Sequence, residues 1–384
     1  MRYARLRSHT TPPEGFPPLT SAASPRFFPR LMAVAALVWG CLMVQPAAAG
    51  EDRILLQGHA DGTVWDETET TTKGQLRLWV AGQIAPGLQG MVLGRFENGG
   101  IDEYSYVDPD HTELEQAWVR YSFPVSVRLV AQAGKMPQPI GAFSRRYLAS
   151  QNPLIGAPAN YDIDYPYAVA LAGRAGHVDF TAAVMDRPLG HQIWLPEPSS
   201  APRPALAAGV TPFTGFRLGA YATWGPYLSS DTQQYVPSGY RWREYTQHVL
   251  GFDLQFSRGH FELNGEMTRS LFEMPEEPQE RGVVWYLEPK YTWSPRWFTA
   301  MRILNNKQTS VWLPGYGSWY VTDENIWDVE TGAGFRIDPR TLVKGSYRFR
   351  RSTEYPSYGP ETDHGVALQL SWSFDVKSWF ERPQ

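Results

Sequence analysis

Residues 366–374, VALQLSWSF, alternate large apolar side chains with small or polar ones. All the large apolar side chains stand at even positions of this stretch. Successive side chains of an extended chain point to opposite faces, so a period of two predicts a β-strand with one apolar face. Residues 343–350 show the same period, with lysine, serine and arginine on the second face.

This alternation returns about sixteen times after residue 49. Seven short connections, rich in Pro and Gly, alternate with eight long polar ones. An apolar face backed by Arg, Lys, Glu and Gln suits a sheet with lipid outside and water inside. The pattern therefore predicts an all-β fold, a transmembrane antiparallel up-and-down β-barrel of sixteen strands. We expect strands at 54–66, 75–85, 88–97, 114–123, 126–135, 167–174, 177–186, 205–211, 216–224, 245–256, 260–270, 282–291, 296–304, 326–337, 341–351 and 364–374.

Two of the predicted strands leave the number of strands open. Pro289 lies inside 282–291, where it removes a hydrogen bond from the ladder, so we expect a bulge or an earlier turn there. Residues 205–211 form a short segment rich in alanine. Fourteen and eighteen strands therefore remain alternatives.

The N-terminal residues have the pattern of a secretory signal. Residues 31–44, LMAVAALVWGCLMV, are apolar, follow Arg26 and Arg30, and precede three alanines. The run is shorter than the ~20 residues of a spanning helix. A retained signal anchor is the alternative. We divide the chain into a leader and signal peptide at 1–49, a barrel at 50–374 and a C-terminal tail at 375–384.

Composition excludes several classes of function. Cys41, the one cysteine, lies within the signal, so the mature chain has no thiolate metal site or disulfide. The chain carries 35 Lys and Arg against 39 Asp and Glu, without a basic run. Because phosphate binding requires clustered positive charge, we expect no nucleic-acid partner.

Catalytic signatures are absent from the sequence. It contains no G-x-S-x-G, H-E-x-x-H, P-loop or G-x-G-x-x-G motif, and its histidines are scattered. We therefore predict that the protein is not an enzyme and has no catalytic residue, metal site or cofactor. Residues 102–110 carry several acids that could bind calcium, but a solvated loop is the favoured reading.

Three segments resemble a known family. They are LEQAWVRY at 114–121, GKMPQPIG at 134–141 and NPLIG at 152–156. They resemble Gram-negative outer-membrane porins, in particular the phosphate-selective-porin-like sequences. The resemblance implies an outer-membrane location, and a loop between strands five and six that folds inward and narrows the barrel. That connection, 136–166, is the longest of all and contains five prolines.

Side-chain parity and this loop together give the candidate pore-lining residues. They are Arg77, Arg95, Arg120, Lys135, Arg145, Arg146, Asp162, Asp164, Arg302 and Arg348. Parity also marks Lys344 and the acidic residues Glu115, Asp253, Glu262, Glu266, Glu288, Asp328 and Glu330 as facing the lumen.

The charges suggest how the pore selects solutes. Rings of charged side chains select ions by sign. We hypothesise that Arg77, Arg95 and Arg120 form a basic wall facing Asp162 and Asp164. The alternative is that these charges are solvated or paired across strands.

The sequence thus predicts an outer-membrane porin, a water-filled channel for passive diffusion of small hydrophilic solutes and ions, anions among them. Its partners would be outer-membrane lipid and the solutes, and a homotrimer is an open alternative to a monomer. Rival functions are a scaffold barrel that houses a partner such as a redox protein, and a membrane hydrolase built on a Ser–His pair. A secreted all-β protein would need something to bury the apolar faces.

Overall fold

The computed structural model describes residues 54–66, 70–98, 110–158, 165–189, 193–194, 199–274, 280–312, 320–353 and 361–376. All belong to one compact unit, Asp52–Gln384. The predicted signal peptide and nearly all of the predicted tail lie outside the described residues. Among the described residues, no helix is long and apolar enough to cross a membrane.

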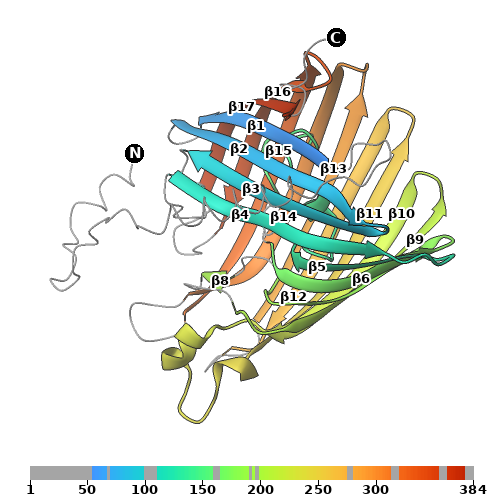
Figure 1. Ribbon diagram of the computed structural model, residues 1–384. Helices are drawn as coiled ribbons and strands as arrows, with labels where there is room; N and C mark the ends of the chain where they lie inside the picture. The colour runs from blue at the N-terminus through green and yellow to red at the C-terminus, as the bar shows by residue number, and fades with distance from the viewer. Residues whose placement is uncertain are drawn as a thin grey trace. The chain divides into compact units, whose positions relative to one another are not determined.

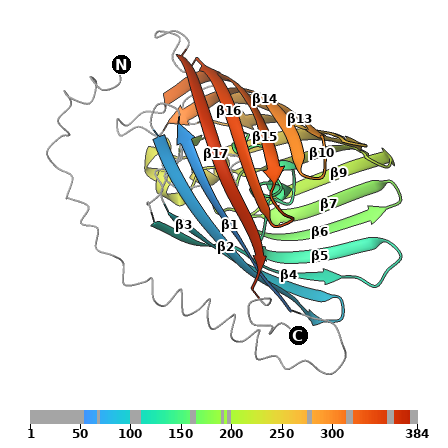
Figure 2. The ribbon, with the colours of Figure 1, turned by 90° about the horizontal axis from the view of Figure 1, so that it is seen from above.

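Sixteen strands form a closed antiparallel β-barrel, which confirms the predicted fold class and strand number (Figures 1 and 2). Neighbours in sequence are neighbours in the sheet, and β1 pairs with β17 to close it. The barrel strands are β1 (Ile54–Asp66), β2 (Thr70–Ala85), β3 (Leu88–Asn98), β4 (Asp110–Ser122), β5 (Arg128–Lys135), β6 (Tyr167–Ala175), β7 (Val178–Met185), β9 (Arg203–Phe213), β10 (Phe216–Pro226), β11 (Thr246–Arg258), β12 (Phe261–Phe272), β13 (Glu280–Thr292), β14 (Trp297–Trp312), β15 (Tyr320–Arg336), β16 (Thr341–Ser352) and β17 (Glu361–Asp375).

Every predicted strand has its counterpart, and short and long connections alternate as expected. The structure adds one two-residue strand that the sequence did not predict, β8 (Ile193–Trp194). It pairs in parallel with Val311 and Trp312, near the end of β14. Among the described parts of the long connections are three short 3-10 helices: η1 (Phe143–Arg145), η2 (Ser230–Tyr235) and η3 (Trp242–Glu244). We refer below to the long-loop end and the short-turn end of the barrel.

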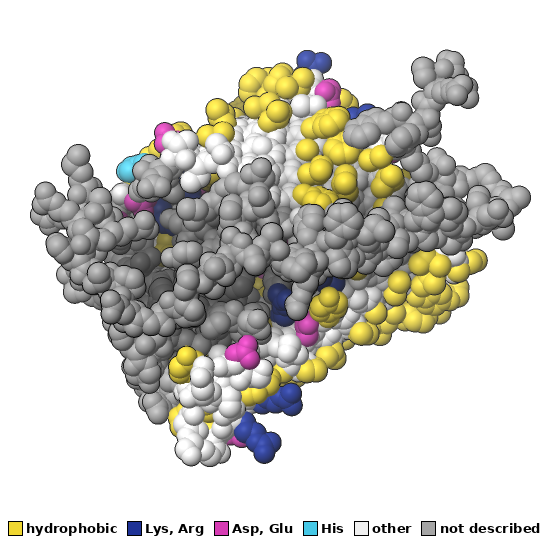
Figure 3. Space-filling view, turned by 60° about the vertical axis from the view of Figure 1, so that its left-hand side comes forward, with side chains coloured by type: hydrophobic (Ala, Val, Ile, Leu, Met, Phe, Trp, Pro, Cys, Tyr) yellow, Lys and Arg dark blue, Asp and Glu magenta, His cyan; other side chains and the backbone are white. Residues whose placement is uncertain are grey.

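The barrel has apolar side chains outside and polar ones inside. On β17, Leu368 and Val366 are 64% and 54% exposed. The inward charged residues Glu288 and Lys344 are no more than 1% exposed. Figure 3 shows hydrophobic side chains gathered along the visible flank of the barrel. This inverted distribution fits a barrel whose outer face meets lipid.

Pro289 does not produce the expected bulge or early turn, so that expectation is wrong. Strand β13 continues through Pro289 to Thr292. The register with β14 is the same on both sides of the proline, with Leu287 opposite Ile303 and Lys290 opposite Ala300. The proline lacks only its own N–H, and the strand tolerates this loss because the ladder bonds on either side keep the two strands aligned.

A glycine inside the barrel leaves room for an aromatic ring, and this gives a first testable expectation. A Cβ on Gly251 would lie 2.0 Å from Cζ of Tyr221, a buried residue on the neighbouring strand. We expect Gly251→Ala to lower the free energy of unfolding by about 1–3 kcal/mol through overpacking. Urea unfolding of the refolded protein measures this. Gly62→Ala is the matched control, since nothing lies within 4 Å of its Cβ position; equal loss in both variants would contradict the expectation.

Candidate functional site

The described part of the connection between β5 and β6, residues 136–158, contacts inward side chains of the barrel wall. Met136 and Ile140, at its start, belong to a buried cluster with small inward residues of β6, β7 and β9. Alanines dominate that wall: they are Ala168, Ala170, Ala183 and Ala205. The alanine-rich strand that weakened the predicted count therefore has a structural role, because small side chains leave space for the loop.

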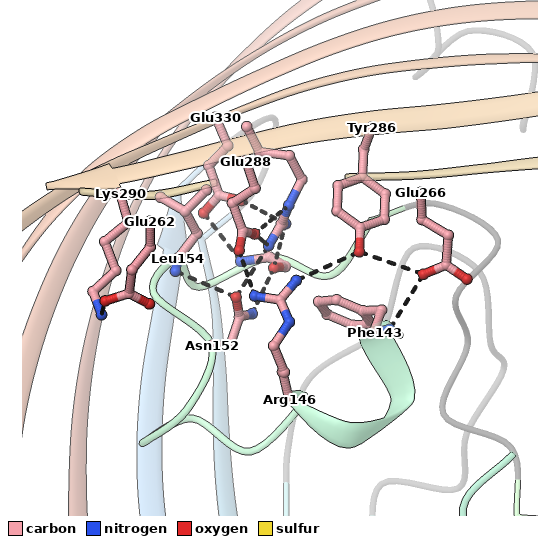
Figure 4. A network of polar contacts seen from close by, with 12 residues as sticks. Phe143, Arg146, Asn152, Leu154, Glu262, Glu266, Tyr286, Glu288, Lys290 and Glu330 are labelled. Carbon is pink, nitrogen blue, oxygen red and sulfur yellow. Dashed lines mark hydrogen bonds and ion pairs between the residues drawn. The ribbon is translucent and has the colours of Figure 1, made fainter. Parts of the chain in front are cut away.

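Glu266 on β12 holds the next part of the loop. Its Oε2 accepts hydrogen bonds from the main-chain N–H groups of Ala142 and Phe143, at 3.1 and 3.2 Å. Its Oε1 accepts one from the hydroxyl of Tyr221 at 2.7 Å. The carboxylate thus fixes the loop where η1 begins (Figure 4).

Arg302 on β14 is the centre of the second contact with the loop. Its Nε donates to Oε2 of Glu288 at 2.9 Å, and its Nη1 to the carbonyl of Gly156 at 2.7 Å. Its Nη2 donates to Oδ1 of Asn152 at 3.0 Å. Arg146 of the loop reaches the same Glu288, with Nη1 2.7 Å from Oε1. One buried carboxylate thus joins a wall arginine to a loop arginine (Figure 4).

Glu330 and Lys344 complete this attachment. Oε1 of Glu330 accepts hydrogen bonds from the N–H groups of Ile155 and Gly156, both at 3.0 Å. Nζ of Lys344 donates to the carbonyls of Asn152 and Leu154, at 3.0 and 2.8 Å. We call the wall residues of these contacts the loop anchor: Glu266, Glu288, Arg302, Glu330 and Lys344.

A second set of charges lies on another part of the wall, on β1 to β5. Arg77 on β2 donates from Nε to Oε2 of Glu115 at 3.0 Å, and its Cζ lies 5.3 Å from the ring centroid of Tyr147 in the loop. The loop therefore contacts both walls. We call this set the charge ladder: Asp61, Lys73, Arg77, Arg95, Glu97, Glu113, Glu115 and Lys135.

A β-bulge shapes the charge ladder. Leu93 pairs with Gln116 and Gly94 with Leu114, so Glu115 is an extra residue on β4. Glu115 and Gln116 are both buried, whereas sequence alternation would send one of them outward. A bulge changes the face of every residue beyond it. It therefore allows Glu113 and Arg120, which have opposite parity, to lie on the inward face of one strand.

The two walls differ in their access to solvent. Side chains of the charge ladder reach 28% exposure at Lys73, 19% at Arg95 and 29% at Glu113. In the loop anchor, Arg302 and Glu330 are 3% exposed and Glu288 is fully buried. Within these two sets, the more exposed charges thus lie on β2 to β4.

The structure describes the side chains of seven of the ten predicted pore-lining residues. Arg77, Arg95 and Lys135 belong to the charge ladder, where each has a carboxylate partner within 3.0 Å. Arg146 and Arg302 meet at Glu288. Arg348 lies on β16 with Nε 2.7 Å from Oδ2 of Asp328, and Arg120 is half-buried. The side chain of Arg145, and both Asp162 and Asp164, lie outside the described residues.

Some site residues have no place among the candidates from the sequence. Arg77 contacts Asp61 and also lies over the ring of Tyr147, with its Cζ 5.3 Å from the ring centroid. Lys135 contacts Glu113, and Arg302 contacts Asn152. Inward parity in β1 could have identified Asp61. Glu113 lies one residue before the predicted strand 114–123, and no periodic pattern marks the loop residues Tyr147 and Asn152.

A Ser–His contact also lies inside the barrel. Oγ of Ser373 is 3.0 Å from Nδ1 of His59, directly across the β1–β17 pairing. The Nε2 of His59 is 3.8 Å from Oδ1 of Asp61, beyond hydrogen-bond distance, and Asp61 also lies near Arg77. Within the described residues, no three His, Cys, Asp or Glu side chains form a group that could hold a metal.

Comparison with known proteins gives likeness in structure alone. No family model and no curated protein matches the sequence. An anion-selective porin from Comamonas acidovorans matches with a TM-score of 0.57 and 12% identity, over 84% of this chain and 99% of that one. OmpF of Salmonella typhi, in complex with daunomycin, matches with a TM-score of 0.56 and 13% identity, over 84% and 97%.

A third match extends the same likeness. OprB of Pseudomonas putida has a TM-score of 0.55 and 10% identity, over 84% of this chain and 94% of that one. The class that the fold defines is therefore the sixteen-stranded β-barrel of outer-membrane porins. The fold of the present chain matches at least 94% of the length of each of these three porins, although the sequences are no more than 13% identical.

Proposed function

We propose that the protein is an outer-membrane porin, a channel for passive diffusion of small hydrophilic solutes and ions. The observation that carries this proposal is the loop inside the barrel, fixed to one wall by the loop anchor and facing water-accessible charges on the other. A sixteen-stranded barrel is wide enough to enclose an aqueous path. The loop then limits solute size, and the charge ladder lines the remaining path.

The half-buried Arg120 favours a weak preference for anions. The ladder pairs most of its cations with carboxylates, so their fields largely cancel. Nε of the half-buried Arg120 has no hydrogen-bond partner among the described residues. Local charges at a constriction matter more than the net charge of −4 for the whole chain.

Single-channel recording of the refolded protein in planar bilayers tests the proposal. We expect stable ohmic steps, and a reversal potential under a KCl gradient that corresponds to a modest excess of anion flux. Silence from protein shown to be folded and inserted would overturn the channel and favour a barrel that houses a partner.

Glu113→Gln should increase the anion preference. Glu113 is one of the more exposed acids of the charge ladder, and it accepts from both Arg95 and Lys135, at 2.8 and 2.7 Å. Removing its charge leaves two cations less neutralised beside the path, so the reversal potential should move further toward the chloride value. Glu244→Gln, an exposed residue of η3 outside the lumen, is the control. An unchanged reversal potential in Glu113→Gln would place the solute path elsewhere.

A hydrolase is the second candidate, supported by the Ser373–His59 contact alone. His59 is 1% exposed and faces inward, away from lipid. Ester hydrolysis by the refolded protein, abolished in Ser373→Ala, would favour it; retention of any such activity in Ser373→Ala would exclude this pair as its source.

A further inference from the structure

Four exposed cations lie on the outer face of the barrel, near the long-loop ends of neighbouring strands. We call them the rim cations: Arg269 on β12, Arg281 on β13, Lys307 on β14 and Arg351 on β16. Each shares its strand face with an outward apolar residue. These apolar residues are Met267 (44% exposed), Leu287 (42%), Met301 (36%) and Tyr347 (43%).

The strand register brings the rim cations together. Arg269 is opposite Val283, and Val283 is opposite Lys307, so both cations lie in one row across three strands. Arg281 is two residues further along β13, opposite Leu271. The cations thus form one arc rather than isolated charges.

An aromatic pair marks the depth of this arc. Arg351 is opposite Trp327 on β15. The ring of Trp327 lies edge-on to that of Trp285, with centroids 5.8 Å apart. Tryptophans on the outer face of membrane barrels collect at the boundary between hydrocarbon and headgroups. The rim cations therefore stand level with the headgroups, where an outward arginine costs little, rather than in hydrocarbon.

The arc is confined to one side of the barrel. Among the described outward positions toward the long-loop end of other strands, Val64, Thr72, Val169 and Trp224 are uncharged and Asp66 is acidic. Glu273 follows β12, and its Oε2 accepts hydrogen bonds from the N–H and hydroxyl of Thr246. Glu361, an exposed acid on β17, is opposite Ser352, the residue after Arg351. Phosphate is the anionic group at headgroup depth, and guanidinium groups bind it through two parallel hydrogen bonds.

We propose that the rim cations bind phosphate-bearing lipid headgroups of the leaflet at the long-loop end. This inference rests on the proposal that the barrel spans the outer membrane, and it does not require the channel to be open. A protein without conductance could still bind lipid in this way, and a conducting one could fail to, so the two proposals fail separately.

Native mass spectrometry of the refolded full-length protein in nonionic detergent tests the site, with phosphatidic acid as the probe. Two comparisons accompany the probe: diacylglycerol with the same acyl chains, which lacks the phosphate, and inorganic phosphate added as a competitor. We expect phosphatidic acid to bind and the other two to have no effect. Since each cation near an anionic lipid surface strengthens binding about fivefold, Arg269→Gln, Lys307→Gln and Arg351→Gln together should weaken it about one hundredfold.

Two variants are matched controls. Arg269→Lys with Arg351→Lys keeps the charge and should retain most of the binding. Arg258→Gln, Arg296→Gln and Arg340→Gln remove the same charge from exposed positions at the short-turn end and should bind as the unchanged protein does. If the triple rim variant does not fold, single variants should each show the fivefold loss. Equal binding of diacylglycerol, displacement by inorganic phosphate or full binding by the rim variants would each overturn the proposal.

Discussion

Arg302→Met is expected to lower the free energy of unfolding by about 3–5 kcal/mol, because it removes one partner from a buried ionic network. Arg302 is 3% exposed and contacts Glu288 and Glu330 on the wall, and Asn152 and Gly156 in the loop. Methionine fills much of the volume but leaves two carboxylates without this cation. Urea unfolding in detergent measures the loss.

The same substitution should also alter the channel. The loop between β5 and β6 would lose two of its hydrogen bonds to the wall, both made by Arg302. We therefore expect larger and noisier single-channel steps. Arg296→Met, at an exposed position in the turn before β14, is the control and should change neither property. A stable Arg302→Met with unchanged conductance would show that this arginine does not hold the loop.

Leu368→Arg is the second substitution with a large expected effect. Leu368 is 64% exposed on the outer face, midway along β17. In lipid an outward arginine near mid-bilayer costs about 2–4 kcal/mol, whereas on a water-exposed surface the change would cost almost nothing. The free energy of unfolding in lipid vesicles therefore reports whether this face meets hydrocarbon.

Thr362→Arg provides the matched control for depth. Thr362 is exposed on the same face of β17, at the long-loop end of the strand. There an arginine should cost about 0–1 kcal/mol, because the cost falls near the interface. Equal costs at positions 362 and 368 would contradict a membrane-spanning barrel and revive the secreted all-β protein.

The barrel wall was largely predictable because its signal is local. Each strand carries an inward and an outward face in its own residues, as Val366 to Phe374 show, and lipid outside makes the contrast strong. Interior charges such as Arg77 and Arg302 followed from the same parity. The bulge at Glu115 was not predictable, since nothing in LEQAWVRY distinguishes an extra residue from a paired one.

Side-chain parity could not predict which residues these charges contact. Arg302 and Asn152 are 150 positions apart, and Lys344 and Asn152 192, yet each pair is in direct contact. Such contacts depend on where the loop settles inside the barrel. The hypothesised basic wall shows what parity leaves out. Parity placed Arg77 and Arg95 inside the barrel, but it did not reveal that carboxylates of β4 pair with them.

The sequence by itself determined the all-β class, the alternation of short and long connections and which face of most strands points inward, and it favoured sixteen strands over fourteen or eighteen. These properties repeat every two residues and need only local backbone geometry and the contrast between lipid and water. Only the tertiary structure decided the attachment of the loop to β12–β16, the pairing within the charge ladder and the arc of rim cations. Each of these depends on closure of the barrel, which brings distant strands to fixed distances and registers that no single segment encodes.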